Sequence, residues 1–420
     1  MLIRFDPLRR APEATELSQL QDAAQSTLRG KQALVVLDNV EPELPAISVV
    51  APLRSAGLTL LLTARQTLPH TVASAEATRT LDLLRAEEAL TLFISALGRT
   101  NADPIRPAER AAAERIVAAL GNHTLAVKLA GAYAAAEGRD LEALARELGN
   151  AAGGLTLPGD DETPEAVRRT FALSLDTLPA DAQQLFAGLA VFATPECGRQ
   201  AALAVGRGLG QSHPEQSLHL LLTRALVDPS NDETLPQDSD RERLRMHPLL
   251  RALAEDLYHR WPQAEQDAAA LVAAQYLANY AETHQTADSV LAADEGNLSG
   301  ALEWAHAHDH PEVVVDLAHG MRKFWDVRGR YGEGMRYLTW AIGEADRHTN
   351  ATTDDRRRGA ELGLTYSTLL YFTGHVADGA LVLQRSLAVF RTVHDRRGEG
   401  AALGLLGELT MGLGQNDAAE

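Results

Sequence analysis

Two short apolar runs near the N-terminus constrain the fold of this chain more than any other feature. Residues 33–37 read Ala-Leu-Val-Val-Leu, and residues 58–62 read Leu-Thr-Leu-Leu-Leu. Each run is too short for a separate helix and lacks the regular polar alternation of a strand with one solvated face. Such runs are typical of strands that are buried on both faces of a parallel sheet. We therefore predict an α/β portion at the N-terminus, in which both strands lie in one parallel sheet.

Polar side chains follow both predicted strands. Asp38 and Asn39 come directly after the first strand, and Thr63 and Arg65 come after the second. The carboxyl ends of parallel strands meet at one edge of a sheet, where ligands of α/β folds bind. A carboxylate there can reach Mg²⁺ beside a bound nucleotide, and an arginine fork matches phosphate oxygens. The alternatives are a carboxylate that serves the turn and a solvated arginine.

The next part of the chain is predicted to be helical. Amphipathic patterns predict helices over residues 87–97, 108–120 and 125–136. Glycine, aspartate and proline then accumulate over residues 149–164, which is typical of a linker. Thr163-Pro164-Glu165 is a good helix start, with a cap, a proline and an acid in the first turn. We expect that helix to carry an apolar face of Val167, Phe171, Leu175 and Leu178.

Residues 218–254 suggest a small winged fold. A helical pattern over 218–225 leads into Leu226-Val227-Asp228. A polar turn over 229–240 separates this run from Arg243-Leu-Arg-Met246, and Pro248 then starts another helix. The pattern predicts a hairpin with a long loop between two helices.

The remainder is helical and weakly repetitive. Glycines at predicted inter-helix turns recur at spacings of 45 and 40 residues, at Gly329, Gly374 and Gly414. With Gly407 and Ala419, the last unit fits the small-residue pattern of tetratricopeptide repeats, although the spacing exceeds their usual ~34 residues. The chain stops where the second helix of that unit should begin, so we expect a truncated array, since solenoids end in a capping repeat.

Two further stretches complete a recognisable set of motifs. Residues 121–126, Gly-Asn-His-Thr-Leu-Ala, place a turn before an alanine-rich helix, and Met246-His247-Pro248 joins the hairpin to its last helix. Taken in order with the two strand ends, these segments resemble the NB-ARC module of STAND signalling ATPases. Residues 37–39 resemble its Walker B motif and residues 62–65 its sensor motif. The resemblance covers about residues 30–260, with repeats following to 420.

The later motifs match with individual departures. Residues 121–126 resemble the family's GLPLA motif, with Thr124 where proline is usual. Residues 166–192 resemble the start of its winged-helix region. Met246-His247-Pro248 resembles its MHD motif in the bacterial form, where proline replaces the final acid.

The resemblance implies a fold that is mainly α with an α/β portion. It implies a partial P-loop NTPase sheet, a helical domain, a winged helix and a TPR-like α-solenoid. We expect a partial nucleotide-binding domain over 1–100, an ARC1-like helical domain over 101–160, a winged helix over 161–262 and TPR-like repeats over 263–420.

The resemblance also implies a mechanism. ADP would hold the module closed with His247 near the β-phosphate, and exchange for ATP would open it and permit oligomerisation. Gly121, Thr124 and Leu125 would lie near the nucleotide, and Asp38 would contact Mg²⁺ through it. A histidine suits this place because its N–H can donate to phosphate and its charge is tunable near neutral pH. The repeats would receive a protein or small-ligand activator.

The phosphate-binding loop of the family has no counterpart in residues 1–32. The family needs Gly-x-x-x-x-Gly-Lys-Ser/Thr before the Walker B strand, but Gly30-Lys31 lacks the earlier glycine and is followed by Gln32. Either the chain is a fragment, or it is a degenerate scaffold with no nucleotide cofactor. Asn39 stands where an acid often activates water, and asparagine cannot act as a general base. We therefore expect a slow switch with little ATPase activity in this chain. A transcriptional regulator whose DNA-binding domain lies outside the chain is a further alternative.

Composition excludes several other functions. The net charge of −18 argues against broad binding to nucleic acid or anionic membranes. The acidic hairpin loop likewise argues against DNA binding by the winged fold. Cys197 is the only cysteine, so no internal disulfide forms, and we interpret it as a buried structural residue in a reducing compartment. No apolar run approaches a membrane span, and no signal peptide opens the chain, so we expect a cytoplasmic protein.

Two clusters in the helical region have competing interpretations. His306, His308 and His310 form either a metal site or a solvated helix end. An aromatic-rich region favours packing between helices, with a peptide-binding groove as the alternative; it contains Trp304, Phe324, Trp325, Tyr331, Tyr337 and Trp340.

Overall fold

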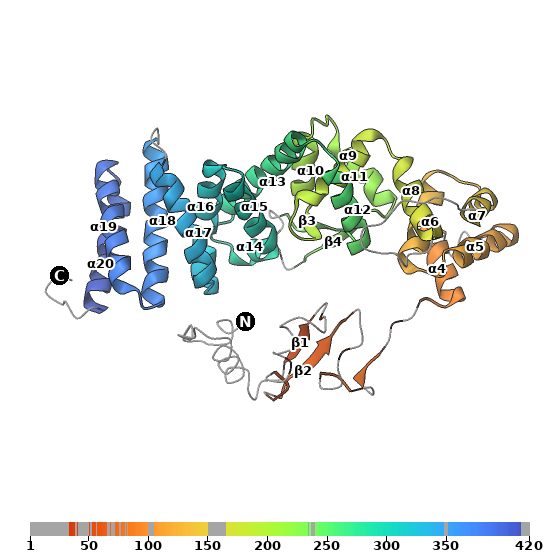
Figure 1. Ribbon diagram of the computed structural model, residues 1–420, viewed down its shortest axis with the longest axis horizontal. Helices are drawn as coiled ribbons and strands as arrows, with labels where there is room; N and C mark the ends of the chain where they lie inside the picture. The colour runs from red at the N-terminus through yellow and green to blue at the C-terminus, as the bar shows by residue number, and fades with distance from the viewer. Residues whose placement is uncertain are drawn as a thin grey trace. The chain divides into compact units, whose positions relative to one another are not determined.

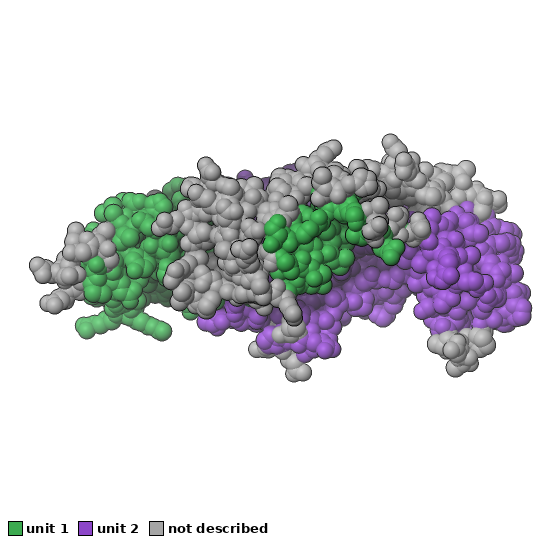
Figure 2. All heavy atoms as spheres, turned by 90° about the horizontal axis from the view of Figure 1, so that it is seen from below, with its two compact units in different colours: residues 1–81, 322–420 green, residues 82–321 purple. Residues whose placement is uncertain are grey.

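The computed structural model divides the chain into two compact units, which Figure 2 shows in different colours. One unit comprises residues 1–81 and 322–420, and the other comprises residues 82–321. The structure describes residues 33–37, 40, 50, 53–55, 57–64, 68, 72–74, 77–79, 81, 83–99, 105–149, 165–233, 235–236, 240–347 and 352–412. The fold class is mainly α with an α/β portion, as predicted.

The two N-terminal strands form the predicted parallel pair. Strand β1 (Leu34–Leu37) pairs with β2 (Thr59–Leu62), in a register that sets Leu37 opposite Leu62 (Figure 1). The chain therefore leaves both strands at the same edge. This confirms the expectation that the polar residues after the two runs follow adjacent strand ends.

The prediction that both strands are buried on both faces is wrong for the described residues. Val35 and Leu58 pack with Leu53 of the crossover in a small apolar cluster. On the other face, Leu34 is 60% exposed and Val36 is 54% exposed. The sheet therefore has one packed face and one exposed apolar face among the residues that the structure describes.

Helices α4 to α7 form a small bundle in the second unit. Helices α4 (Ala86–Ala96), α5 (Pro107–Ala119) and α6 (Thr124–Ala136) lie within one residue of the predicted bounds, and α7 (Leu141–Gly149) follows them. Helix α4 packs on α5 and α6, and α5 packs on α7. The close contact of α4 with α6 needs Gly131, since a methyl group there would lie 2.6 Å from Ala96 Cβ.

A three-stranded antiparallel sheet with surrounding helices follows. Helices α8 (Glu165–Asp176) and α9 (Ala180–Gly188) precede the 3-10 turn η2 (Leu189–Val191) and β3 (Glu196–Gly198). Helices α10 (Arg199–Gly208) and α11 (Pro214–Thr223) then lead to β4 (Asp228–Asn231), β5 (Glu242–Arg245) and α12 (Pro248–His259). The strand order is β3-β5-β4. The predicted hairpin is confirmed, whereas β3 was not predicted.

The apolar face predicted for α8 is buried where its side chains are described. Phe171 and Leu175 of α8 are buried, and so is Leu178, which lies beyond the end of the helix at Asp176 and not on it as predicted. Val167 lies outside the residues whose side chains the structure describes.

The chain ends in a helical, solenoid-like region. The second unit continues with α13 (Gln263–Thr283), α14 (Asp288–Ala293) and α15 (Glu295–Ala307). Helix α16 (Pro311–Arg328) leads to α17 (Tyr331–Arg347), α18 (Thr353–Phe372), α19 (Val376–Thr392) and α20 (Arg396–Gly412). Each of α17, α18 and α19 packs on the next helix (Figure 1).

Small residues make the contact between α18 and α19 close. A methyl group at Gly363 would lie 2.2 Å from Ser386 Oγ, and Ser367 Oγ donates to the carbonyl oxygen of Gly379 at 2.9 Å. Two of the predicted inter-helix turns are confirmed at Gly329 and Gly374, whose φ angles of 64° and 83° favour glycine. The third, at Gly414, lies outside the described residues.

The aromatic-rich region packs mainly between helices. Phe324, Trp325, Tyr331 and Tyr337 are buried, and the Trp325 and Tyr337 rings lie 5.6 Å apart. This favours the packing interpretation for these four residues. No helix among the described residues is long and apolar enough to cross a membrane.

Candidate functional site

The sheet edge after β1 and β2 is the first predicted part of the site. The Thr63 N–H donates to the Leu37 carbonyl oxygen at 3.0 Å, and the Thr63 carbonyl oxygen accepts from the Val40 N–H at 2.7 Å. The backbone of Thr63 thus bonds the chain on either side of positions 38 and 39. The other predicted residues of this edge lie outside the described residues: Asp38, Asn39 and Arg65.

The turn before α6 is the second predicted part. Gly121 and Asn122 both have φ of 59°, a left-handed conformation that glycine and asparagine adopt most readily. This reverses the chain after α5, so that His123 becomes the N-cap of α6 and its Nδ1 accepts from the Ala126 N–H at 3.4 Å. Thr124 is exposed as the first residue of α6, whereas Leu125 is buried beneath it.

The start of α12 is the third predicted part. His247 is the N-cap of this helix, and Pro248 occupies its first position, where the missing N–H is not needed. His247 Nδ1 accepts from the Leu249 N–H at 3.2 Å. Since Nδ1 is the acceptor, the neutral ring carries its proton on Nε2. His247 therefore has an N–H donor on the ring edge that does not cap the helix.

The second and third parts lie close together within one unit. The pKa of His247 is lowered first by burial of part of its ring and then by the charge of His123, although the residue as a whole is exposed. Lys128 and Arg245 lower this pKa further, and Asp228 raises it. The predicted residues Gly121, Thr124 and Leu125, at the start of α6, and His247, at the start of α12, lie in the same unit.

An ion pair fixes the relation between α6 and the antiparallel sheet. Lys128, on the second turn of α6, donates to the Asp228 carboxylate at the start of β4. Asp228 lies opposite Arg245 in the register of β4 and β5. The helix that begins at the GLPLA-like turn is therefore tied to the strand pair that leads to His247.

This arrangement is suited to an anionic group. Two helix N-termini, each carrying partial positive charge, are brought together with a neutral histidine that can donate from Nε2. Lys128 and Arg245 add two cations, and Asp228 offsets one of them. Phosphate oxygens match such donors. The described residues thus fit a phosphate-bearing cofactor on this side.

Sequence reasoning missed His123, Lys128, Asp228 and Arg245. His123 stands inside the 121–126 motif and Lys128 stands two residues after it, so their nearness to the site was open to inference. Asp228 and Arg245 belong to the site because β4 pairs with β5 and because Lys128 of α6 bonds Asp228. No local sequence pattern signals either contact.

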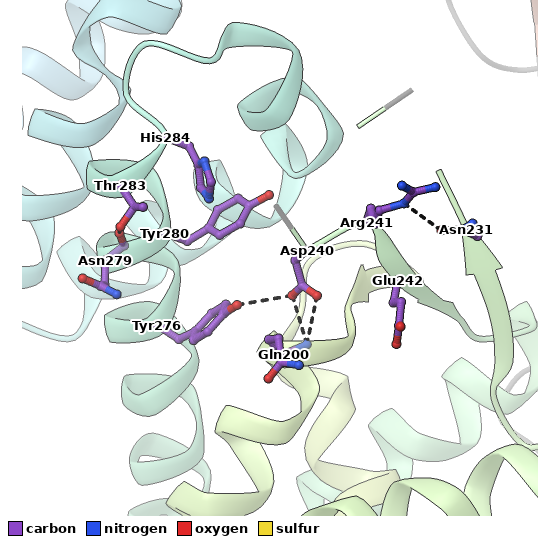
Figure 3. Close-up of a pocket in the computed structure, with 10 residues that line it drawn as sticks. All are labelled: Gln200, Asn231, Asp240, Arg241, Glu242, Tyr276, Asn279, Tyr280, Thr283 and His284. Carbon is purple, nitrogen blue, oxygen red and sulfur yellow. Dashed lines mark hydrogen bonds between the residues drawn. The ribbon is translucent and has the colours of Figure 1, made fainter. Parts of the chain in front are cut away.

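A separate pocket of about 910 Å³ lies in the same unit (Figure 3). It is bounded by the β4–β5 hairpin, the start of α10 and one face of α13. At its base the buried Asp240 carboxylate accepts from the Gln200 N–H at 3.0 Å and from the Tyr276 hydroxyl at 3.3 Å. Burial raises the pKa of Asp240. The lining is predominantly polar: Gln200, Asn231, Asp240, Arg241, Glu242, Tyr276, Asn279, Tyr280, Thr283 and His284.

Two other candidates have structural explanations. Cys197 is buried in β3 without a disulfide partner, and burial raises the pKa of its thiol, which disfavours the reactive thiolate. The His308 and His310 rings stack on Trp304 with centroids 4.8 Å and 5.1 Å away. Within the described part of the chain, no group of three or more possible ligands is placed to hold a metal ion.

Comparison with known proteins gives a family match for the N-terminal segment. Residues 6–103 match the family model of the NB-ARC domain. This match covers the segment that holds both strand ends, and it agrees with the resemblance read from them. Comparison with curated proteins gives no match.

A solved structure is also similar. It is the Signal Transduction ATPase with Numerous Domains (STAND) protein with a tetratricopeptide repeat sensor from Pyrococcus horikoshii. The two share 12% sequence identity with a TM-score of 0.41, over 96% of this chain and 62% of that one. This chain therefore spans 62% of the length of that protein.

Proposed function

We propose that this chain is part of a nucleotide-dependent switch in signalling or transcriptional regulation, with ADP and ATP as its alternative ligands. The observation that carries the proposal is the ion pair of Lys128 with Asp228, which ties the helix that begins at the 121–126 turn to the strand pair that leads to His247. These segments are far apart in sequence, and the resemblance assigns both to the nucleotide. The NB-ARC match over residues 6–103 supports the same ligand.

In this proposal each part of the site has a distinct role. His247 donates from Nε2 to the β-phosphate of ADP, and the backbone of Gly121, Thr124 and Leu125 borders the nucleotide. Asp38 contacts Mg²⁺, which neutralises charge on the phosphates when it is bound. Thr63 and Arg65 respond to the terminal phosphate, and Asn39 leaves the Walker B edge without a general base. Little ATP hydrolysis is therefore expected from this chain.

The same proposal assigns roles to the domains of the chain. The domain division at residues 100, 160 and 262 remains a proposal, as do the winged-helix assignment and the TPR character of the last helices. The TPR-like repeats would bind a protein or small-ligand activator, and nucleotide exchange would permit oligomerisation in the cytoplasm. The chain itself would bind neither nucleic acid nor membrane.

Calorimetric titration of ADP and ATP with Mg²⁺ tests the proposal. We expect sub-millimolar binding of ADP, weakened at least about tenfold by His247→Ala, because hydrogen bonds to charged groups are worth about 1.5–3 kcal/mol. Arg65→Ala should weaken ATP more than ADP. The matched control is His219→Ala, which removes an exposed histidine from the middle of α11.

The absence of nucleotide binding would favour the scaffold interpretation over the switch interpretation. If neither nucleotide gives detectable heat, the chain would act through protein contacts alone and without a nucleotide cofactor. Equal weakening by His247→Ala and His219→Ala would mean that ADP binds elsewhere.

A further inference from the structure

A buried arginine anchors the central strand of the antiparallel sheet. Arg243, in β5, is 2% exposed, and its guanidinium forms an ion pair with the Asp294 carboxylate at the start of α15. The Nη1–Oδ2 distance is 2.6 Å and the Nη2–Oδ1 distance is 2.8 Å, which is a two-pronged pair. Arg243 Nε also donates to Glu196 of β3 at 3.2 Å. A buried charge needs such partners, so α15 and β5 are tied together.

Asn297, one turn further along α15, holds the segment before β3. Its side-chain oxygen accepts from both the N–H and the hydroxyl of Thr194, each at 3.0 Å. Its side-chain nitrogen donates to the Glu196 carbonyl oxygen at 2.8 Å and to Asp294 at 3.1 Å. We call Arg243, Asp294, Asn297 and Thr194 the polar joint.

Both sides of the polar joint lead to His247. Strand β5 ends at Arg245, two residues before His247, and the Met246 N–H donates to the Pro195 carbonyl oxygen at 2.8 Å. On the other route, Arg251 of α12 donates to the Thr194 carbonyl oxygen at 2.9 Å. Both segments that position His247, the end of β5 and the start of α12, are therefore fastened through the joint to α15.

Two glycines bring α15 into unusually close contact with this region. A methyl group at Gly296 would lie 2.5 Å from Thr194 Cγ2, and one at Gly300 would lie 2.5 Å from Ala193 Cβ. Displacement of α15 toward this segment would therefore have to move residues 193–194. Close-packed contacts of this kind transmit displacement instead of absorbing it.

We propose that the polar joint couples the first helices of the solenoid-like region to His247, so that displacement of α14 and α15 repositions this histidine. The coupling gives the proposed nucleotide site its regulation, and in that respect it rests on the proposed function. A ligand that acts on the helical region would reach His247 along β5 and α12.

Amide hydrogen exchange of the full chain tests the coupling without any nucleotide. Gly300→Ala wedges α15 away from Ala193. Thr194→Val changes the shape little but removes the hydroxyl that lies 3.0 Å from Asn297 Oδ1 and 2.6 Å from the Glu196 carbonyl oxygen. We expect both variants to speed exchange of the Met246 and Arg251 amides at least about tenfold by promoting local opening. The control is Gly404→Ala in α20, where an added methyl group meets nothing within 4 Å.

The outcomes separate the coupling from the nucleotide proposal. If Thr194→Val and any folded Gly300→Ala protein exchange Met246 and Arg251 at the wild-type rate, the coupling is wrong. If the wild type binds ADP, Gly300→Ala should weaken it at least about fivefold, the lower end of ordinary couplings, whereas Gly404→Ala should not. If the variants exchange faster but the chain does not bind ADP, the coupling proposal stands and the nucleotide proposal is wrong.

Discussion

At the residue scale, two histidines show how one ring can serve structure and chemistry together. His123 and His247 each use Nδ1 to cap a helix, which fixes the ring and the tautomer. The sequence identified His247 through its motif. It did not reveal the charges around the ring, because Lys128, Asp228 and Arg245 converge only through helix packing and strand pairing. Asp38, Asn39 and Arg65 stay predictions.

The lowered pKa of His247 predicts a pH dependence of stability. The unfolded chain has an ordinary histidine pKa of about 6.5, so it binds a proton more readily than the folded chain below that value. Stability should therefore fall as the pH drops through about 6.5. We expect His247→Gln to reduce the loss of melting temperature between pH 7.5 and pH 5.5 that is seen in the wild type. An identical loss in both proteins would show that His247 does not titrate abnormally.

At the element scale, local patterns predicted the helices well and the antiparallel sheet only in part. Helices α4, α5 and α6 follow apolar periodicity, and their ends lie within one residue of prediction. Strand β3 has only three residues and no apolar run, so its pairing with β5 leaves no local signal. The burial of β1 was overestimated because an apolar run does not reveal how many faces are covered.

Two arginines beside Tyr133 of α6 allow an internal comparison of buried and exposed ion pairs. Arg224 is 3% exposed, bonds Glu137 and donates to Thr177 Oγ1 at 2.7 Å, which ties α6 to α8 and α11. Arg139 reaches the same ring from the surface, where it pairs with Glu147 at 2.7 Å.

Methionine substitutions should therefore have unequal effects. We expect Arg224→Met to cost about 2–3 kcal/mol of unfolding free energy, since its buried bonds are lost. Arg139→Met should cost less than about 1 kcal/mol, as exposed pairs do. Urea denaturation followed by circular dichroism measures both. Equal costs would mean that Arg224 contributes no more than a surface charge.

At the scale of the whole molecule, stability should differ along the chain. Strands β1 and β2 share one small apolar cluster and expose Leu34, Val36 and Leu61 on the other face. Helices α18 and α19 instead pack closely against each other, with small residues at Gly363 and Gly379. Parts with few buried contacts open most readily.

Hydrogen exchange should reveal this difference. We expect the amides of β1 and β2 to exchange at least about a hundredfold faster than those in the middle of α18, a difference of roughly 2.7 kcal/mol in opening free energy. Helices α4 to α6 serve as an internal comparison, because they are packed on one another within the second unit. Equal protection in β1, β2 and α18 would contradict this expectation.

The burial of the Trp325 indole should be visible in the fluorescence of the protein. Trp325 is fully buried, so its fluorescence should be blue-shifted relative to that of the partly exposed Trp340 on the next helix. Both belong to the unit that holds residues 322–420, whereas Trp261 and Trp304 belong to the other. Single-tryptophan variants would therefore let the emission spectrum follow the melting of each unit separately, with no added label.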